Sequence, residues 1–191
     1  DEVMTSLGRH GKWFGFEHWD FVPDIVVIAK SLTNGTVPLG ATIVTKEVAQ
    51  KFEGGMPEML RHSYTFLGHP VACAAALKTL EIMERENLLD NSRIMGEYLF
   101  DSLGSLRKHR IVGEIKGGLG LDCQVNFVKN QETGEKFSAE ENGRFIGMLK
   151  KKLRQAGLWG AVANPIQLRP ALVITRGEID EIVSGLDKAL G

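Results

Sequence analysis

Two short apolar runs, each introduced by a proline, constrain the fold of this chain more than any other feature. The first spans residues 24–29 behind Pro23, and the second spans residues 39–45 behind Pro38. Both have the length of a strand, and continuous rather than alternating apolar residues are typical of strands buried on both faces. We therefore expect these two strands to belong to a sheet that helices cover on both sides.

A long helix is predicted after these strands. Pro70 suits the first turn of a helix, and residues 71–86 are rich in alanine and contain no helix breaker. Apolar residues then recur at helical spacing over residues 91–109, whereas those from Leu119 to Phe127 alternate as in a half-exposed strand. The second half of the chain thus mixes helices with half-exposed strands, an α+β arrangement, after a first part that resembles the end of a buried α/β sheet.

The C-terminal third predicts two more helices. The apolar positions of residues 145–153 follow helical spacing, and Gly157 could cap that helix. Thr175 and Glu178 have the spacing of a capping box at the start of the last helix. We place the domain boundary within the long helix, near Met83, so that residues 1–83 form one domain and residues 84–191 the second.

Charge and hydropathy exclude several classes of function. The 23 basic residues balance 24 acidic ones, which leaves no excess of positive charge for binding nucleic acid. No apolar stretch reaches the roughly 18 residues that a membrane helix needs, so we expect a soluble, cytoplasmic protein. The two cysteines are expected to be free, and His62 with His69 lacks the further ligands of a metal site, so no metal is assigned.

Three segments could carry chemistry. They are Asp1 to Val3 at the start, Lys30 directly after the first apolar run, and Thr65 to Pro70 before the long helix. Each segment taken singly is weak evidence, because a lysine after a strand is usually a solvated charge and a threonine before a helix is often a cap. Their order and their flanking sequences make the functional interpretation stronger.

The flanking sequences resemble one known family. The segments are DEVMTSLGRHGKWFGFEHW, PDIVVIAKSLTNGTVPLGATIVTKEV, HSYTFLGHPVACAAALKTLEIME, VGEIKGGLGL and PALVITRGEIDEIV. Together they are similar to the class III (omega) aminotransferases of pyridoxal 5'-phosphate (PLP) fold type I, over nearly the whole chain. The resemblance implies a fold class: the end of the large domain, a mainly parallel sheet flanked by helices, followed by a small α+β C-terminal domain.

The resemblance also implies roles for single residues. Lys30 corresponds to the catalytic Schiff-base lysine, Asp1 to the carboxylate that pairs with the pyridine nitrogen, and Val3 to the side chain against one ring face. Thr65 corresponds to the residue that reaches the cofactor phosphate of the neighbouring subunit, which implies a homodimer with shared active sites. These roles fit the chemistry, because a carboxylate favours the protonated ring and a lysine amine can both hold an aldehyde and carry a proton.

The chain departs from the family pattern in two respects. Members are about twice this length, so we expect the N-terminal half to be missing and the chain to be a fragment, a split gene product or a proteolytic product. The arginine that often grips a substrate carboxylate is replaced by Gln167, with Arg169 two residues on. Both are candidate substrate-binding residues, and the replacement favours amines or ω-amino compounds as donors.

The expected reaction is a ping-pong transfer of an amino group from an amino acid or amine to a 2-oxo acid. Two alternatives stay open at this point. Another PLP enzyme of the same fold, such as a racemase, aminomutase or decarboxylase, would use the same cofactor with a different pocket. A dimerisation or folding module without catalysis would keep the fold alone. We expect the isolated polypeptide to be inactive.

Overall fold

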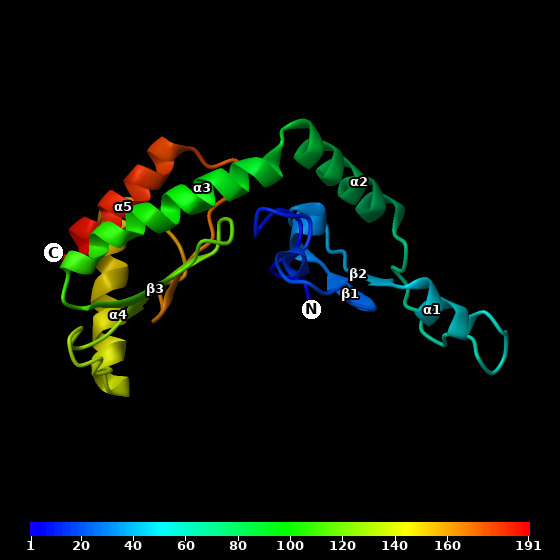
Figure 1. The fold of residues 1–191 in the computed structure, drawn as a ribbon, viewed down its shortest axis with the longest axis horizontal. Helices are drawn as coiled ribbons and strands as arrows, with labels where there is room; N and C mark the ends of the chain where they lie inside the picture. The colour runs from blue at the N-terminus through cyan, green and yellow to red at the C-terminus, as the bar shows by residue number, and fades with distance from the viewer. The chain divides into compact units, whose positions relative to one another are not determined.

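The computed structural model describes residues 1–191, and the chain divides into two compact units, Asp1–Leu89 and Asp90–Gly191 (Figure 1). We describe each unit by itself. The expected domain boundary near Met83 falls inside a helix of the first unit, shortly before this division.

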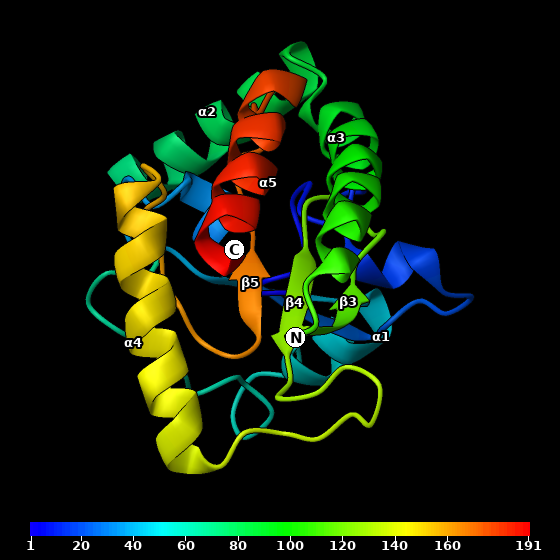
Figure 2. The same ribbon diagram turned by 90° about the vertical axis from the view of Figure 1, so that its left-hand side faces the viewer.

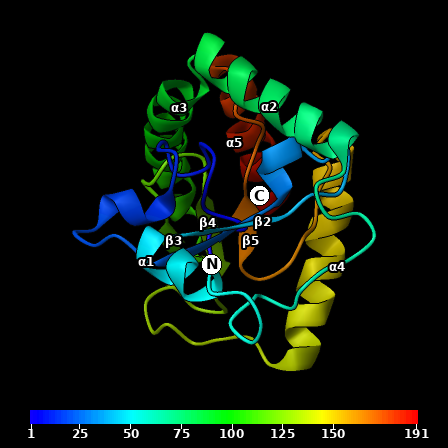
Figure 3. The ribbon, with the colours of Figure 1, turned by 90° about the vertical axis from the view of Figure 1, so that its right-hand side faces the viewer.

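The first unit contains two short strands and two helices. The strands are β1 (Ile25–Ile28) and β2 (Ala41–Val44), and the helices are α1 (Lys46–Ala49) and α2 (Pro70–Arg85). Three single turns of 3-10 helix complete it: η1 (Gly15–His18), η2 (Lys30–Thr33) and η3 (Gln50–Phe52). Figure 3 follows the chain from α1 through a long loop to the start of α2. Both predicted strands and the predicted alanine-rich helix are therefore confirmed.

The expectation that these two strands are buried on both faces is wrong for this chain. β1 and β2 pair with each other antiparallel, with Ile25 opposite Val44 and Ile28 opposite Ala41, so no parallel pair is formed here. Val26 and Ile28 are buried, whereas the residues that alternate with them in β1 are exposed, and most of β2 is exposed. The reason is that the unit covers one face of β1 only.

The second unit combines an antiparallel sheet with three helices (Figure 2). The strands β3 (Val112–Lys116), β4 (Cys123–Phe127) and β5 (Ile166–Leu168) lie in the order β3-β4-β5. The helices are α3 (Leu88–Leu103, which begins just before the division), α4 (Ala139–Gln155) and α5 (Arg176–Leu190), and the 3-10 turn η4 (Gly104–Lys108) follows α3. This matches the α+β arrangement expected for the C-terminal part.

The core of the second unit lies between the sheet and its helices. Cys123, Val125 and Phe127 alternate inward along β4, as the sequence pattern predicts, and pack with leucines of α3, α4 and α5. Phe127 meets Phe145 of α4 edge-on, with ring centroids 5.1 Å apart. Burial raises the pKa of the Cys123 thiol to about 11, which keeps it protonated and inert.

Two predicted helix ends are confirmed. The Thr175 hydroxyl accepts from the backbone N–H of Glu178 at 3.4 Å, and the Glu178 carboxylate accepts from the backbone N–H of Thr175 at 2.8 Å. Gly157 follows α4 with φ +81°, a conformation that glycine adopts without strain, and the N–H of Leu158 reaches back to Leu153. No helix of the structure has both the length and the apolar composition needed to cross a membrane.

Candidate active site

The segment that starts at Asp1 lies beside β1. The backbone N–H of Glu2 donates to the carbonyl of Val27 at 2.9 Å, which ties the segment to the strand one residue before its end. Asp1 is exposed, and one of its carboxylate oxygens accepts from the backbone N–H of Val3 at 2.8 Å. Val3 is half-buried. The fold thus brings Asp1 and Val3 to the strand that leads into Lys30.

Lys30 has an unusual backbone conformation. It begins η2 directly after β1, and its φ is +42°, in the left-handed region that costs a residue with a Cβ about 1–2 kcal/mol. Leu7, Asn34 and Asn87 also have positive φ, but the short asparagine side chain tolerates that conformation better than leucine or lysine does. A strained residue that persists is held by its surroundings, and such residues cluster at functional sites.

The side chain of Lys30 is exposed and forms no ion pair. Its Nζ contacts the sulfur of Met4, which belongs to the same segment as Asp1 and Val3. A thioether is a weak acceptor, so this contact leaves the amine available for chemistry in a way that a carboxylate would not. The segment that contains Asp1 and Val3 therefore contacts Lys30 through Met4.

A hollow lies next to Lys30 in the same unit. Its volume is about 580 Å³, and its walls are Lys30, the loop of residues 35–40, Tyr64 and Phe66. Thr65 stands between the last two residues in an exposed turn before α2, whose N-cap is His69. The hollow therefore connects the segment around Thr65 with Lys30, although Thr65 itself does not line it.

Glu2 is the residue that sequence analysis missed. It is only 8% exposed, and its carboxylate accepts from the hydroxyl of Thr5 and from the backbone N–H groups of Gly15 and Phe16, at 3.0 and 2.8 Å. Burial raises the pKa of this carboxyl, but the three hydrogen bonds, with a contribution from His10, bring the pKa below its ordinary value. No local pattern predicts this, because the two amides lie 13 and 14 residues along the chain.

Gln167 lies in the middle of β5 in the second unit, and Arg169 directly follows this strand. The Nη1 of Arg169 donates to the Gln167 side-chain oxygen at 2.6 Å, so the two side chains lie on the same side of the chain, as the alternation of a strand predicts. The Nε of Arg169 donates to Asp122 at 2.8 Å, and both side chains of this ion pair are mostly covered. Arg169 is thus already neutralised by a carboxylate.

A comparison with protein families identifies the chain. The family model described as aminotransferase class-III matches residues 1–190. The chain belongs to the class-III aminotransferase family. This confirms the resemblance and excludes a fold unrelated to these enzymes.

Named relatives and solved structures agree with this assignment. The taurine–pyruvate aminotransferase of Bilophila wadsworthia is 38% identical over 203 residues, which cover 99% of this chain and 43% of that protein. The putrescine–pyruvate aminotransferase of Pseudomonas aeruginosa is 33% identical, over 100% of this chain and 41% of that protein. The (S)-enantioselective omega-transaminase of Thermomicrobium roseum superposes with a TM-score of 0.93 at 37% identity, over 100% of this chain and 42% of that one.

These matches confirm the fold class and define how much of the family is represented. The chain corresponds to the C-terminal part of class-III transaminases of PLP fold type I, the end of the large domain followed by the small domain. It spans less than half the length of the relatives that it matches. In this class-III aminotransferase chain, Asp1, Val3 and Lys30 lie within residues 1–190, the range that the family model matches.

Proposed function

We propose that this chain is the C-terminal part of a PLP-dependent aminotransferase that transfers an amino group from an amine or amino acid to a 2-oxo acid. The observation that carries the proposal is Lys30. It has a strained backbone, an exposed amine without an ion pair, and a contact with the segment that contains Asp1. Membership of an aminotransferase family supports the same reaction.

The residues present fit PLP as a ligand. Imine formation with the aldehyde of PLP requires a primary amine whose protonated form is not stabilised by a neighbouring carboxylate. Lys30, which forms no ion pair and whose Nζ contacts the Met4 sulfur, meets this condition. A pyridine nitrogen that is to stay protonated requires a carboxylate, and Asp1 is exposed in the segment that contacts Lys30 through Met4. Val3, half-buried in the same segment, suits one face of the ring. We propose that Thr65, before α2, binds the phosphate of a cofactor held by a second subunit.

When bound, PLP withdraws electrons from the substrate carbon that carries the amine, which makes the proton on that carbon removable. Lys30 would hold the cofactor between turnovers, and its Nζ would accept that proton and deliver it again. Asp1 would keep the ring nitrogen protonated. We also propose that residues 1–83 belong to the large cofactor-binding domain and residues 84–191 to the small domain.

The donor is proposed to be an amine or an ω-amino compound, and the acceptor a 2-oxo acid. Two of the three guanidinium nitrogens of Arg169 already donate, Nε to Asp122 and Nη1 to Gln167, which disfavours a bidentate contact with a substrate carboxylate. Gln167 offers amide hydrogen bonds without charge. Two relatives carry names with taurine and putrescine as donors and pyruvate as acceptor, and neither donor has an α-carboxylate.

We further propose that activity needs a homodimer and the part of the family fold that this chain does not span. The matched region is about 43% of the relatives' length, and the exposed apolar residues of β1 and β2 suit packing against the remainder. Thr65 acts across the dimer in this proposal, so each active site would combine residues from two subunits.

The decisive experiment maps where PLP attaches. The polypeptide is combined with a separately made N-terminal half of a class-III relative, incubated with PLP, reduced with borohydride and digested, and the modified lysine is identified by mass spectrometry. We expect the label on Lys30 and its loss in a Lys30→Ala variant, whereas the matched Lys51→Ala variant keeps it. Label distributed over the exposed lysines without preference would contradict the proposed cofactor site and favour a folding or dimerisation module instead.

A further inference from the structure

We propose that Glu2 is a positioning residue of the Lys30 site, the buried anion that holds Asp1, Val3 and Met4 against β1. The inference rests on the proposed function for its catalytic meaning, but its structural basis is independent of any cofactor. Glu2 does not contact Lys30. It acts through the segment to which it belongs.

The carboxylate of Glu2 connects two parts of the first unit. One oxygen accepts from the N–H of Phe16, and the other accepts from the N–H of Gly15 and the hydroxyl of Thr5. Charge-assisted hydrogen bonds in a buried place are stronger than neutral ones, and removing one partner leaves the others unsatisfied. The carboxylate therefore fastens the first residues to the turn that begins η1.

The backbone of Glu2 is held as firmly as its side chain. Its N–H donates to Val27 of β1 at 2.9 Å, and its carbonyl accepts from both the N–H and the hydroxyl of Ser6, at 3.1 and 2.6 Å. Met4 lies between these anchored residues, and its sulfur is the group that meets Lys30 Nζ. A shift of Glu2 therefore moves Met4 relative to Lys30, along with Asp1 next to it.

Gly15 offers an independent way to disturb the same contact. A Cβ on this residue would lie 3.0 Å from one oxygen of Glu2, 3.2 Å from the other and 3.0 Å from the Cβ of Thr5. These distances are tighter than ordinary Cβ contacts, so the carboxylate and Thr5 would have to shift by a few tenths of an ångström. An alanine at this position leaves the charge of Glu2 intact and shifts its carboxylate together with Thr5.

The test measures the reactivity of the Lys30 amine without any cofactor. Trace acetylation followed by peptide mass spectrometry gives the ratio of Lys30 to Lys51, an exposed lysine of the same unit. We expect the ratio to rise by about twofold or more in Glu2→Gln and in Gly15→Ala. Loss of one hydrogen bond of Glu2 should lower the population in which Met4 contacts Lys30 by about that factor. A merely structural role would change the labelling of both lysines together.

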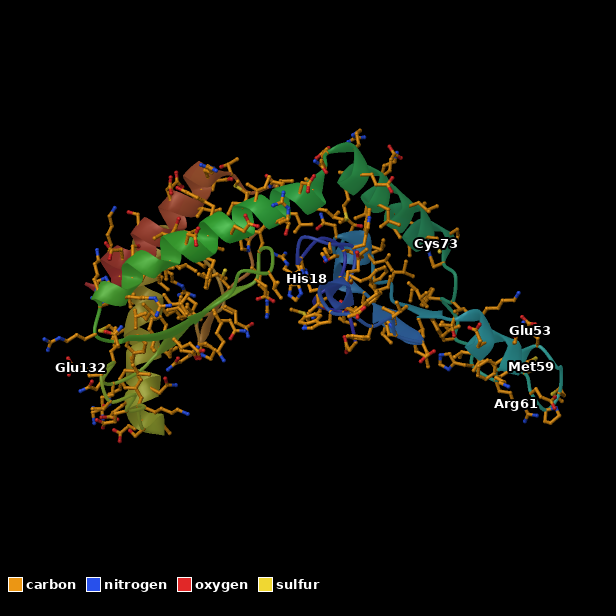
Figure 4. All side chains as sticks on the ribbon, in the orientation of Figure 1. His18, Glu53, Met59, Arg61, Cys73 and Glu132 are labelled. Atoms are coloured by element: carbon orange, nitrogen blue, oxygen red, sulfur yellow. The ribbon has the colours of Figure 1, made fainter.

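Matched variants provide the controls. Glu53→Gln removes a carboxylate from the exposed loop after α1, where Figure 4 labels this residue, and Gly143→Ala adds a Cβ that meets nothing within 4 Å. Both should keep the wild-type ratio. If Glu2→Gln does not fold, Gly15→Ala and Thr5→Val, which removes one of the three donors, carry the test.

Two outcomes separate this inference from the proposed function. An unchanged ratio in folded Glu2 and Gly15 variants would overturn the positioning role, even if PLP attaches to Lys30. A changed ratio together with PLP attached elsewhere would support the positioning role and overturn the cofactor assignment of Lys30.

Discussion

The two units of the chain differ in how completely they bury their apolar residues. In Asp90–Gly191 the leucines of three helices close over the inner face of the sheet, and several of them are entirely buried. In Asp1–Leu89 the strands β1 and β2 leave Ile25 and Ile43 about half exposed, at 53% and 46%. The unit that carries the candidate cofactor residues is thus the one that leaves more of its apolar residues exposed, whereas the other unit buries its core more completely.

The largest expected effect is on transaminase activity, which the proposed site in the first unit would provide. The polypeptide by itself is expected not to transaminate, because the proposed site needs groups from the part of the family fold that this chain does not span. Mixing it with a separately made N-terminal half of a class-III relative should restore transfer from an amine such as putrescine to pyruvate, measured as alanine formed. Ready turnover by the 191-residue polypeptide alone would contradict the proposal that the first unit needs the rest of the family fold for catalysis.

A pair of truncations tests the packing difference directly. Leu149→Ala in α4 removes a fully buried side chain and should lower the free energy of unfolding by about 2–5 kcal/mol. Ile43→Ala in β2 truncates an exposed side chain and should change it by less than about 0.5 kcal/mol. Urea unfolding followed by tryptophan fluorescence measures both. Equal losses would show that β2 is covered in solution, which would break the comparison.

The smallest effect concerns acid stability of the second unit. Lys108 and His109 donate to Asp187 of α5 at 2.8 and 2.6 Å, and these hydrogen bonds hold the pKa of the carboxyl below its ordinary 3.8. A carboxyl group whose pKa is lower in the folded than in the unfolded chain contributes its full stability at pH values above its unfolded pKa, here about 3.8. That contribution is lost as the pH falls below about 3.8 and passes through the folded pKa.

Asp187→Asn should therefore lower the melting temperature slightly at neutral pH and flatten its decline in acid. The matched variant Asp101→Asn, on exposed surface of α3, should leave the pH profile unchanged. If the melting temperature of Asp187→Asn declines in parallel with that of the wild type throughout the acid range, this network does not contribute to the acid stability of the unit.

Sequence patterns alone predicted the order of the elements and the ends of several helices. The strand before Lys30, the alanine-rich helix from Pro70, the capping box at Thr175 and the turn at Gly157 all depend on residues within a few positions of one another. Such features follow from local geometry, because a cap or a periodic apolar face needs no distant partner. The family and its candidate lysine were recognised from the same local motifs.

Tertiary structure alone decided which distant groups meet. β1 and β2 pair antiparallel, β3 pairs with β4 although no pattern marked it as a strand, and Arg169 meets Asp122 across 47 residues. The anchoring of Glu2 by Gly15 and Phe16 belongs to the same class. These contacts depend on how the backbone folds back on itself. A buried carboxylate accepts hydrogen bonds from the donors that the folded backbone brings near it. The sequence by itself therefore determined the candidate lysine, and the tertiary structure decided what holds its surroundings in place.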